Sequence, residues 1–340
     1  MSYVSLLEGC SGPVLFLIMV ILIFILSRGA DILVEEAAAL SIRLRISRLI
    51  VGLVFVSIGT TLPEAAVSVF AALGGNPEIA LGNAVGSVIC NTGLILGLIT
   101  LLAPISLENL SIKRQGWFQC GAGILLVASC IPFFQTDHFF ETRVWLPRQM
   151  GMVFLVLLFF YFLVSIYWFR DKHHDLNNGD DQTNNTPIAL VLGRIIVGSV
   201  MVVSASHFLV PGVEAAAVRM NIPRGFVSAT MVAFGTSLPE LVTSIKAVQK
   251  NMGELALGNI IGANILNVLF VAGFSASITK GGLAAPGHFS KVLFPAMMAT
   301  LIIFGLGMHL SGRVFKKSYS VMLLSIYALV ILSNFLGMAA

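Results

Sequence analysis

The chain has 340 residues, of which 57% are hydrophobic and 11% charged, and its formal net charge is +4. A soluble domain carries about 25% charged residues, so this composition excludes an ordinary soluble protein and indicates an integral membrane protein. The positive charge does not indicate nucleic-acid binding, because the basic residues lie in short loops between apolar segments.

Ten apolar segments follow one another along the chain. A helix needs about 20 apolar residues to cross the roughly 30 Å hydrocarbon core of a bilayer. The expected spans are 14–40, 49–74, 78–103, 117–134, 149–169, 188–217, 225–249, 253–278, 290–310 and 317–338. The apolar runs are continuous and do not alternate with polar residues, so they predict an all-α membrane protein and not a β-barrel.

The loop charges predict an orientation in the membrane. If the first helix runs from outside to inside, twelve loop lysines and arginines fall inside and six fall outside. The positive-inside rule then places both termini outside and the central polar stretch 170–187 in the cytoplasm. Short loops without a large regulatory domain favour a multi-pass protein of a bacterial inner membrane.

The two halves of the chain are related by an internal repeat. Residues Gly59–Asn91 align without a gap on Gly235–Asn267, an offset of 176, with fifteen identities in thirty-three positions. We expect a first five-helix repeat at 1–169, a linker at 170–187 and a second repeat at 188–340. Because five is odd, the second repeat enters the membrane from the opposite side, and inverted repeats are typical of secondary transporters.

The first repeated motif lies in segments 49–103 and 225–278 and places oxygen donors on one helical face. Ser57, Thr60, Thr61 and Glu64 are spaced i, i+3, i+4 and i+7. The equivalent positions in the second copy are Ala233, Thr236, Ser237 and Glu240. Proline precedes each glutamate, removes a helical N–H and frees carbonyl oxygens one turn earlier. In lipid those carbonyls need another partner, and a cation can supply it.

The second repeated motif adds amides. Asn83, Ser87 and Asn91 are spaced i, i+4 and i+8 on one face, and their counterparts are Asn259, Ala263 and Asn267. The pairs Gly82/Gly86 and Gly258/Gly262 are small-xxx-small motifs that permit close helix packing.

Together these donors are hard oxygens. Calcium takes six to eight such ligands, and sodium accepts them as well, whereas no cysteine–histidine set suits zinc or copper. One glutamate in a span, or one GxxxG, could serve packing alone. Two glutamates at matched positions of an inverted repeat favour function, because burying each costs about 2.5–3.5 kcal/mol on insertion scales.

These motifs resemble those of the calcium/cation antiporter superfamily, which includes the sodium/calcium exchangers. The family pattern "G-T-S-x-P-E" falls on Gly59–Glu64 and Gly235–Glu240, and "G-N-x-x-G-S-N-I-x-N/D" falls on 82–91 and 258–267. The resemblance covers essentially the whole chain. It implies that the second, third, seventh and eighth helices form a cation-binding core, with the first and sixth sliding across it.

The resemblance also implies a ligand set. Glu64 and Glu240 would be the principal carboxylates, with hydroxyl or carbonyl oxygens from Thr60, Thr61, Thr236 and Ser237. Ser57 and Ala233 would offer backbone carbonyls. The centre would be lined by Asn91 and Asn267, and Ser87 completes the set.

Three positions depart from the family pattern. Ser57 replaces a small apolar residue, Val88 replaces the motif asparagine and Ala263 replaces the motif serine. Exchangers of the family often have an acid at one of the two positions that Asn91 and Asn267 occupy. With two formal charges, the site balances one Ca²⁺, two Na⁺ or two protons, whereas a third Na⁺ would leave it positive in a low-dielectric core.

The leading interpretation is therefore a secondary antiporter that exchanges Ca²⁺ for Na⁺, with H⁺ as the alternative counter-ion. A cation channel would gather its filter around an axis of several subunits, and here one chain supplies a two-fold site. An enzyme could use two glutamates as acid and base, but the sequence has no nucleophile–base pair and no HExxH. We expect no cofactor, no nucleic acid and no obligatory protein partner.

Overall fold

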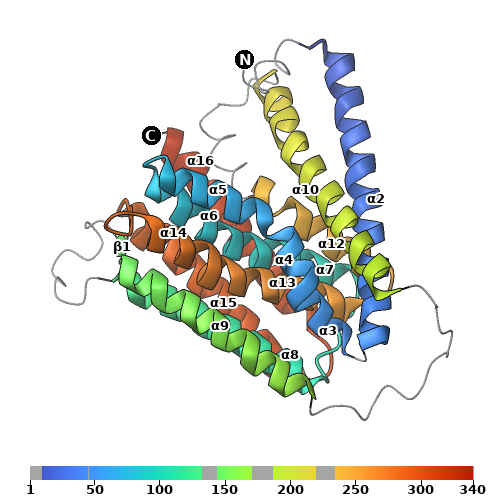
Figure 1. The fold of residues 1–340 in the computed structure, drawn as a ribbon. Coiled ribbons are helices and arrows are strands. Elements are labelled where there is room, and N and C mark those ends of the chain that lie inside the picture. Colours follow the sequence, from blue (N-terminus) through green and yellow to red (C-terminus); the bar gives the residue numbers. More distant parts are fainter. Residues whose placement is uncertain (1–9, 45, 132–143, 171–186, 220–233, 340) are drawn as a thin grey trace.

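The computed structural model describes residues 10–44, 46–131, 144–170, 187–219 and 234–339. Within these ranges the chain is almost entirely helical (Figure 1). Six described helices are long and apolar enough to cross a membrane, or seven if the bent pair Arg48–Thr60 and Leu62–Leu73 forms one span. The chain is therefore a multi-pass membrane protein. Most of the expected linker, and the first nine residues of the expected span 225–249, lie outside the described residues.

The helices of the first half match the positions expected from the apolar runs, with π-helical segments labelled η. In chain order they are α2 (Gly12–Leu44), α3 (Arg48–Val51), η1 (Gly52–Val56), α4 (Ser57–Thr60), α5 (Leu62–Leu73), α6 (Pro77–Ile89), η2 (Cys90–Leu96), α7 (Gly97–Leu102), α8 (Leu110–Cys130) and α9 (Arg148–Arg170).

The second half repeats this pattern as far as it is described. Its helices are α10 (Ile188–Arg219), α12 (Leu238–Gln249), α13 (Gly253–Leu266), η4 (Asn267–Ala272), α14 (Gly273–Ile278), η5 (Phe289–Leu293), α15 (Phe294–Leu310) and α16 (Lys317–Ala339). Strands β1 (Val144–Leu146) and β2 (Leu283–Ala285) pair antiparallel and tie a loop of one half to a loop of the other.

The helices form a central group with two flanks. The motif helices α5, α6, α12 and α13 pack together at the centre. The long helices α2 and α10 run side by side along one flank of this group (Figure 1). Helices α8, α9 and α15 lie along the other flank, and α16 packs against α15 and α7. The motifs therefore lie in the interior, between a two-helix pair and an outer layer.

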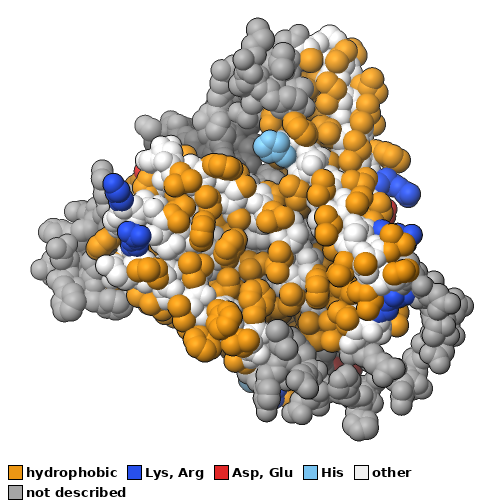
Figure 2. All heavy atoms as spheres, viewed as in Figure 1, with side chains coloured by type: hydrophobic (Ala, Val, Ile, Leu, Met, Phe, Trp, Pro, Cys, Tyr) orange, Lys and Arg blue, Asp and Glu red, His pale blue; other side chains and the backbone are white. Residues whose placement is uncertain are grey.

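The outer surface matches a lipid environment. Figure 2 shows one face covered largely by hydrophobic side chains, with the visible lysines and arginines near its edges. Large apolar side chains point outward, among them Phe16, Phe24 and Phe70, whose exposed fractions are 65%, 65% and 73%. In a bilayer these side chains contact lipid tails and need no protein partner.

The proline in each copy of the first motif interrupts a helix as expected. The axis bends by 44° between Arg48–Thr60 and Leu62–Leu73, and Thr61 lies at the break. In the second half Ser237 stands directly before α12, with Pro239 in the first turn. Proline is tolerated in a first turn because those N–H groups have no helical partner. Each glutamate consequently lies in the first turn of a new helix.

Two of the predicted small-residue positions bring backbones into contact. Helix α13 packs against α3 and η1 so closely that a Cβ added to Gly258 would overlap the carbonyl oxygen of Leu49. A Cβ at Gly262 would overlap the carbonyl oxygen of Leu53 in the same way. Glycine is required here because a carbonyl oxygen in a helix cannot move aside as a flexible side chain can.

We expect Gly258→Ala to destabilise the protein by at least about 1–3 kcal/mol, the usual cost of overpacking. The matched control is Gly82→Ala, 176 residues earlier, where an added Cβ would lie 3.3 Å from the ring of Phe289, a side chain that can shift. Thermal unfolding of both variants in detergent compares the two positions. If Gly258→Ala and Gly82→Ala lowered the thermal stability equally, the close backbone packing at Gly258 would be contradicted.

Candidate ion-binding site

Glu64 and Glu240 lie at the centre of the molecule. Their exposed fractions are both 0%, and each lies in the first turn of its helix, α5 or α12. The N-terminus of a helix stabilises negative charge. The two carboxylates also interact electrostatically with each other. The interruption at each proline therefore brings two buried acids, one from each half, into a single site.

The hydroxyl groups of each half bond to the carboxylate of the other. Thr61 Oγ1 donates to Glu240 Oε1 at 3.2 Å, and Ser237 Oγ donates to Glu64 Oε1 at 3.3 Å. Thr61 and Ser237 are 176 residues apart, as are the two glutamates. The bond from Thr61 to Glu240 is therefore the counterpart of the bond from Ser237 to Glu64. The two copies of the motif contact each other through this equivalent pair of bonds.

One oxygen of each carboxylate has no partner. Glu64 Oε2 and Glu240 Oε2 are buried and make no hydrogen bond, and the described residues contain no ion pair to either glutamate. Leaving a buried charge unpaired costs several kcal/mol. A cation between the two acids would remove that cost.

Asn91, Asn267 and Ser87 bring further unpartnered polar atoms. All three side chains are 0% exposed, and the amide oxygens and nitrogens of both asparagines and Ser87 Oγ lack hydrogen-bond partners. The π-helical segments η2 and η4 begin at Cys90 and at Asn267, so both asparagines lie in wide helical turns. Such turns are frequent at functional sites.

The first motif position differs from what the sequence predicts. The Ser57 carbonyl keeps a helical partner, the N–H of Thr61 at 2.9 Å, and also accepts from Thr60 Oγ1 at 3.4 Å. The Ser57 hydroxyl donates to the Leu53 carbonyl. The Ser57 carbonyl is therefore not freed by the proline, and its role as an ion ligand stays a prediction. Pro63 instead removes the regular donor of the Gly59 carbonyl. The equivalent Ala233 lies outside the described residues.

Two asparagines outside the expected ligand set join the halves. Asn83 Oδ1 accepts from Thr236 Oγ1 at 3.1 Å, and Asn259 Oδ1 accepts from Thr60 Oγ1 at 3.2 Å. The presence of Gly-Asn at the same place in both copies is the sequence signal for them. Their spacing, one turn before Ser87 and Ala263, gave no indication that Asn83 and Asn259 contact the other half.

A second polar cluster connects this core to α8. Asn264 Nδ2 and Gln119 Nε2 both donate to Thr92 Oγ1, at 2.9 and 3.3 Å, and the amide oxygens of Asn264 and Gln119 have no partner. Comparison of the repeats cannot find this cluster, because the positions equivalent to Asn264 and Thr92 are Val88 and Val268.

The donor set suits a hard cation. It consists of two carboxylates with neutral hydroxyl and amide oxygens, the ligand types that calcium and sodium accept. Among the described residues no group of three or more His, Cys, Asp or Glu side chains is placed to hold a metal. The site therefore presents two carboxylates, and no cluster of soft ligands lies among the residues that the structure describes.

Ion pairs hold α2 against its neighbours away from this site. Asp31 lies 3.2 Å from both Lys246 and Lys250, where α12 ends. Lys250 also lies 2.6 Å from Glu35. Burial alone would lower the pKa of Lys250, but its hydrogen bonds to Glu35 and Asp31 raise that pKa overall. These contacts form a brace between α2 and α12.

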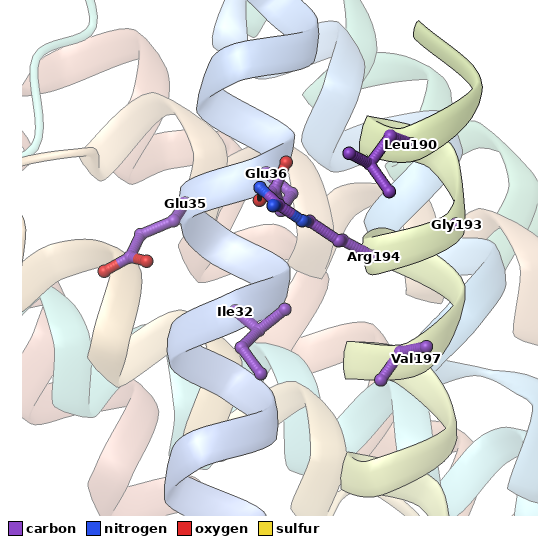
Figure 3. Close-up of a pocket in the computed structure, with 7 residues that line it drawn as sticks. All are labelled: Ile32, Glu35, Glu36, Leu190, Gly193, Arg194 and Val197. Carbon is purple, nitrogen blue, oxygen red and sulfur yellow. Dashed lines mark hydrogen bonds and ion pairs between the residues drawn. The ribbon is translucent and has the colours of Figure 1, made fainter. Parts of the chain in front are cut away.

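A pocket opens between α2 and α10 beside this brace. Figure 3 shows Glu36 and Arg194 pointing toward each other across it, while Glu35 points away from α10. The Glu36–Arg194 pair measures 2.9 Å. The pair is half-exposed at Arg194, where the side chain is 52% accessible, so it contributes little to stability.

Comparison with protein families gives one match over most of the chain. The model of the sodium/calcium exchanger protein family matches residues 14–169 and 190–336. These two ranges cover both halves and omit the central polar stretch.

Individual relatives and a solved structure agree with this match. The chain is 32% identical to the putative antiporter CaxA of Alkalimonas amylolytica, covering 81% of this chain and 85% of that protein. It is 28% identical to the sodium/calcium exchanger MaX1 of Methanosarcina acetivorans, covering 85% and 89%. A structure of the sodium-calcium exchanger NCX_Mj soaked with 10 mM Na⁺ and zero Ca²⁺ superposes with a TM-score of 0.76 at 26% identity, covering 95% and 98%.

Proposed function

Because the chain belongs to the sodium/calcium exchanger family, we propose that it is a secondary active antiporter that exchanges Ca²⁺ for Na⁺ across the membrane. One observation carries this proposal. Two fully buried carboxylates, Glu64 and Glu240, each keep one oxygen without a partner, beside the unpartnered amides of Asn91 and Asn267. A site of this charge and chemistry needs a cation, and the transported ions supply it.

Ten spans arranged as two inverted repeats underlie the proposed mechanism. We place the first repeat at 1–169 and the second at 188–340, with the 170–187 linker in the cytoplasm and both termini outside. The exchanged bonds between Thr61 and Glu240, and between Ser237 and Glu64, support a two-fold relation between the halves. An odd number of spans in each half makes that relation an inversion.

Alternating access follows if α2 and α10 move across the core. Under the two-fold relation, the contact of α2 with α12 is equivalent to that of α10 with α5. Helix α2 packs along α12 and is braced by Asp31, Lys246 and Lys250, whereas α10 makes few contacts with α5. The difference between these two equivalent contacts supports a conformation in which access to the site is closed at the end where α2 is braced against α12. In the proposed orientation this is the cytoplasmic end. In the opposite conformation, α10 would pack along α5 and α2 would separate from α12, so the site would be closed at the other end.

The charge of the site bears on the counter-ion. Glu64 and Glu240 supply two negative charges, and Asn91 and Asn267 add none. One Ca²⁺ leaves the site neutral, and so do two Na⁺ or two H⁺. We therefore propose an electroneutral exchange, with H⁺ as the alternative counter-ion because each free carboxylate oxygen could also take a proton.

Ca²⁺ flux in liposomes tests this function. We expect vesicles loaded with Na⁺ to accumulate radioactive Ca²⁺ when diluted into Na⁺-free buffer, and we expect the accumulation to stop when an ionophore collapses the Na⁺ gradient. A parallel arm with an outward H⁺ gradient identifies the alternative counter-ion. Uptake driven by neither gradient would overturn the antiporter, and single-channel currents across a planar bilayer would indicate a channel.

A further inference from the structure

We propose that Asn83 and Asn259 are positioning residues that orient the threonine ligands of the opposite half toward the cation. The inference rests on the proposed function, since it concerns the same site. Each asparagine accepts the hydroxyl proton of a threonine, Thr236 for Asn83 and Thr60 for Asn259. The threonine oxygen then presents its lone pairs to the ion.

The amide of each asparagine is held in one orientation. Asn83 Nδ2 donates to the Glu64 carbonyl at 3.1 Å and to Ser68 Oγ at 3.0 Å. Both N–H groups are used, so the amide oxygen is left to face Thr236. Asn83 is only 2% exposed, so water does not compete for these bonds.

The second asparagine repeats the arrangement. Asn259 Nδ2 donates to Thr243 Oγ1 at 3.2 Å and to Ser244 Oγ at 3.3 Å, and the residue is 1% exposed. Ser244 is the 176-residue counterpart of Ser68. Thr60 has a second, longer acceptor in the Ser57 carbonyl at 3.4 Å.

The chemistry of a hydroxyl explains why its proton must be held. A threonine hydroxyl has one donor and two acceptor lone pairs. If the proton points into the site, it repels a cation; if it points to an amide oxygen, the hydroxyl has no proton directed at the ion. An amide oxygen cannot donate, so Asn83 and Asn259 can only accept this proton, and for Thr60 the amide oxygen of Asn259 is nearer than the Ser57 carbonyl.

A double-mutant cycle on the apparent KM for Ca²⁺ tests the inference. Thr236→Val removes the hydroxyl with little change of shape, and Asn83→Ala removes its acceptor. We expect each single variant to raise the KM about three- to tenfold, the equivalent of one hydrogen bond. The double variant should match Thr236→Val alone, because Asn83 acts through that hydroxyl. The control cycle pairs Asn83→Ala with Thr60→Val, and there the two effects should multiply.

The outcomes separate positioning from a structural role. If the paired effects in KM multiply at Asn83/Thr236, or if coupling appears only in the unfolding temperature, the inference is overturned while Ca²⁺ exchange by the unaltered protein still stands. If the unaltered protein moves no Ca²⁺, the proposed function itself fails. Should Asn83→Ala not fold, the equivalent cycle of Asn259→Ala with Thr60→Val gives the same test.

Discussion

Replacing Glu64 or Glu240 by glutamine is expected to abolish Ca²⁺ exchange while leaving the protein folded and inserted. The substitution keeps the size of the side chain and removes one of the two charges of the site. A bound Ca²⁺ would then leave a net positive charge in a fully buried site. Removing one partner of a buried charge pair costs about 3–5 kcal/mol, which corresponds to a loss of roughly a hundredfold or more in ion affinity. Initial rates of Ca²⁺ uptake into liposomes, normalised to reconstituted protein, measure the loss.

The same variants should be no less stable than the parent protein without ions. Glutamine relieves the cost of burying a carboxylate whose second oxygen has no partner. A matched control is Glu108→Gln, where the side chain is 61% exposed and pairs with Arg313 at the surface. That variant should transport normally. Near-normal transport by Glu64→Gln or Glu240→Gln would show that the ligand assignment is wrong.

The fold was largely predictable because the bilayer imposes a strong pattern. Each of the ten apolar runs contains at least one described helix, because a span must satisfy its own backbone hydrogen bonds. The interruptions at Pro63 and Pro239 follow from the missing N–H of proline. The close approach at Gly258 follows from the absence of a side chain. Each of these features depends on local chemistry that a sequence displays.

The site was predictable only where the two halves repeat each other. Glu64 and Glu240 stand at matched positions, and the structure brings them into one buried cluster. The cluster of Thr92, Gln119 and Asn264 lacks a repeated counterpart and depends on how α8 packs, which local patterns do not encode. The ion pairs of Asp31 depend equally on tertiary packing.

Replacing Asn267 by aspartate is expected to make the exchange electrogenic. Asn267 is fully buried, and neither its amide oxygen nor its amide nitrogen has a partner. A third carboxylate there would allow the site to hold three Na⁺ against one Ca²⁺, so one positive charge would cross the membrane in each cycle. During Ca²⁺ uptake that charge leaves the vesicle, so an inside-positive potential should accelerate uptake and an inside-negative potential should slow it. One charge moving through the full potential gains about 2.3 kcal/mol per 100 mV, which allows a change in rate of up to roughly tenfold for 60 mV.

Potentials set with K⁺ and valinomycin separate the variant from the parent protein. The parent site carries two negative charges, from Glu64 and Glu240, so its uptake should not respond to the potential. The matched variant Asn91→Asp, 176 residues earlier in the repeat, should respond as Asn267→Asp does, because the equivalent amide is equally buried and unpartnered. Voltage-dependent Ca²⁺ uptake by the parent protein would contradict the assignment of two negative charges to its site. Voltage-independent uptake by an active Asn267→Asp variant would show that this position does not face the transported ions, because an added charge next to them must change how many the site can hold.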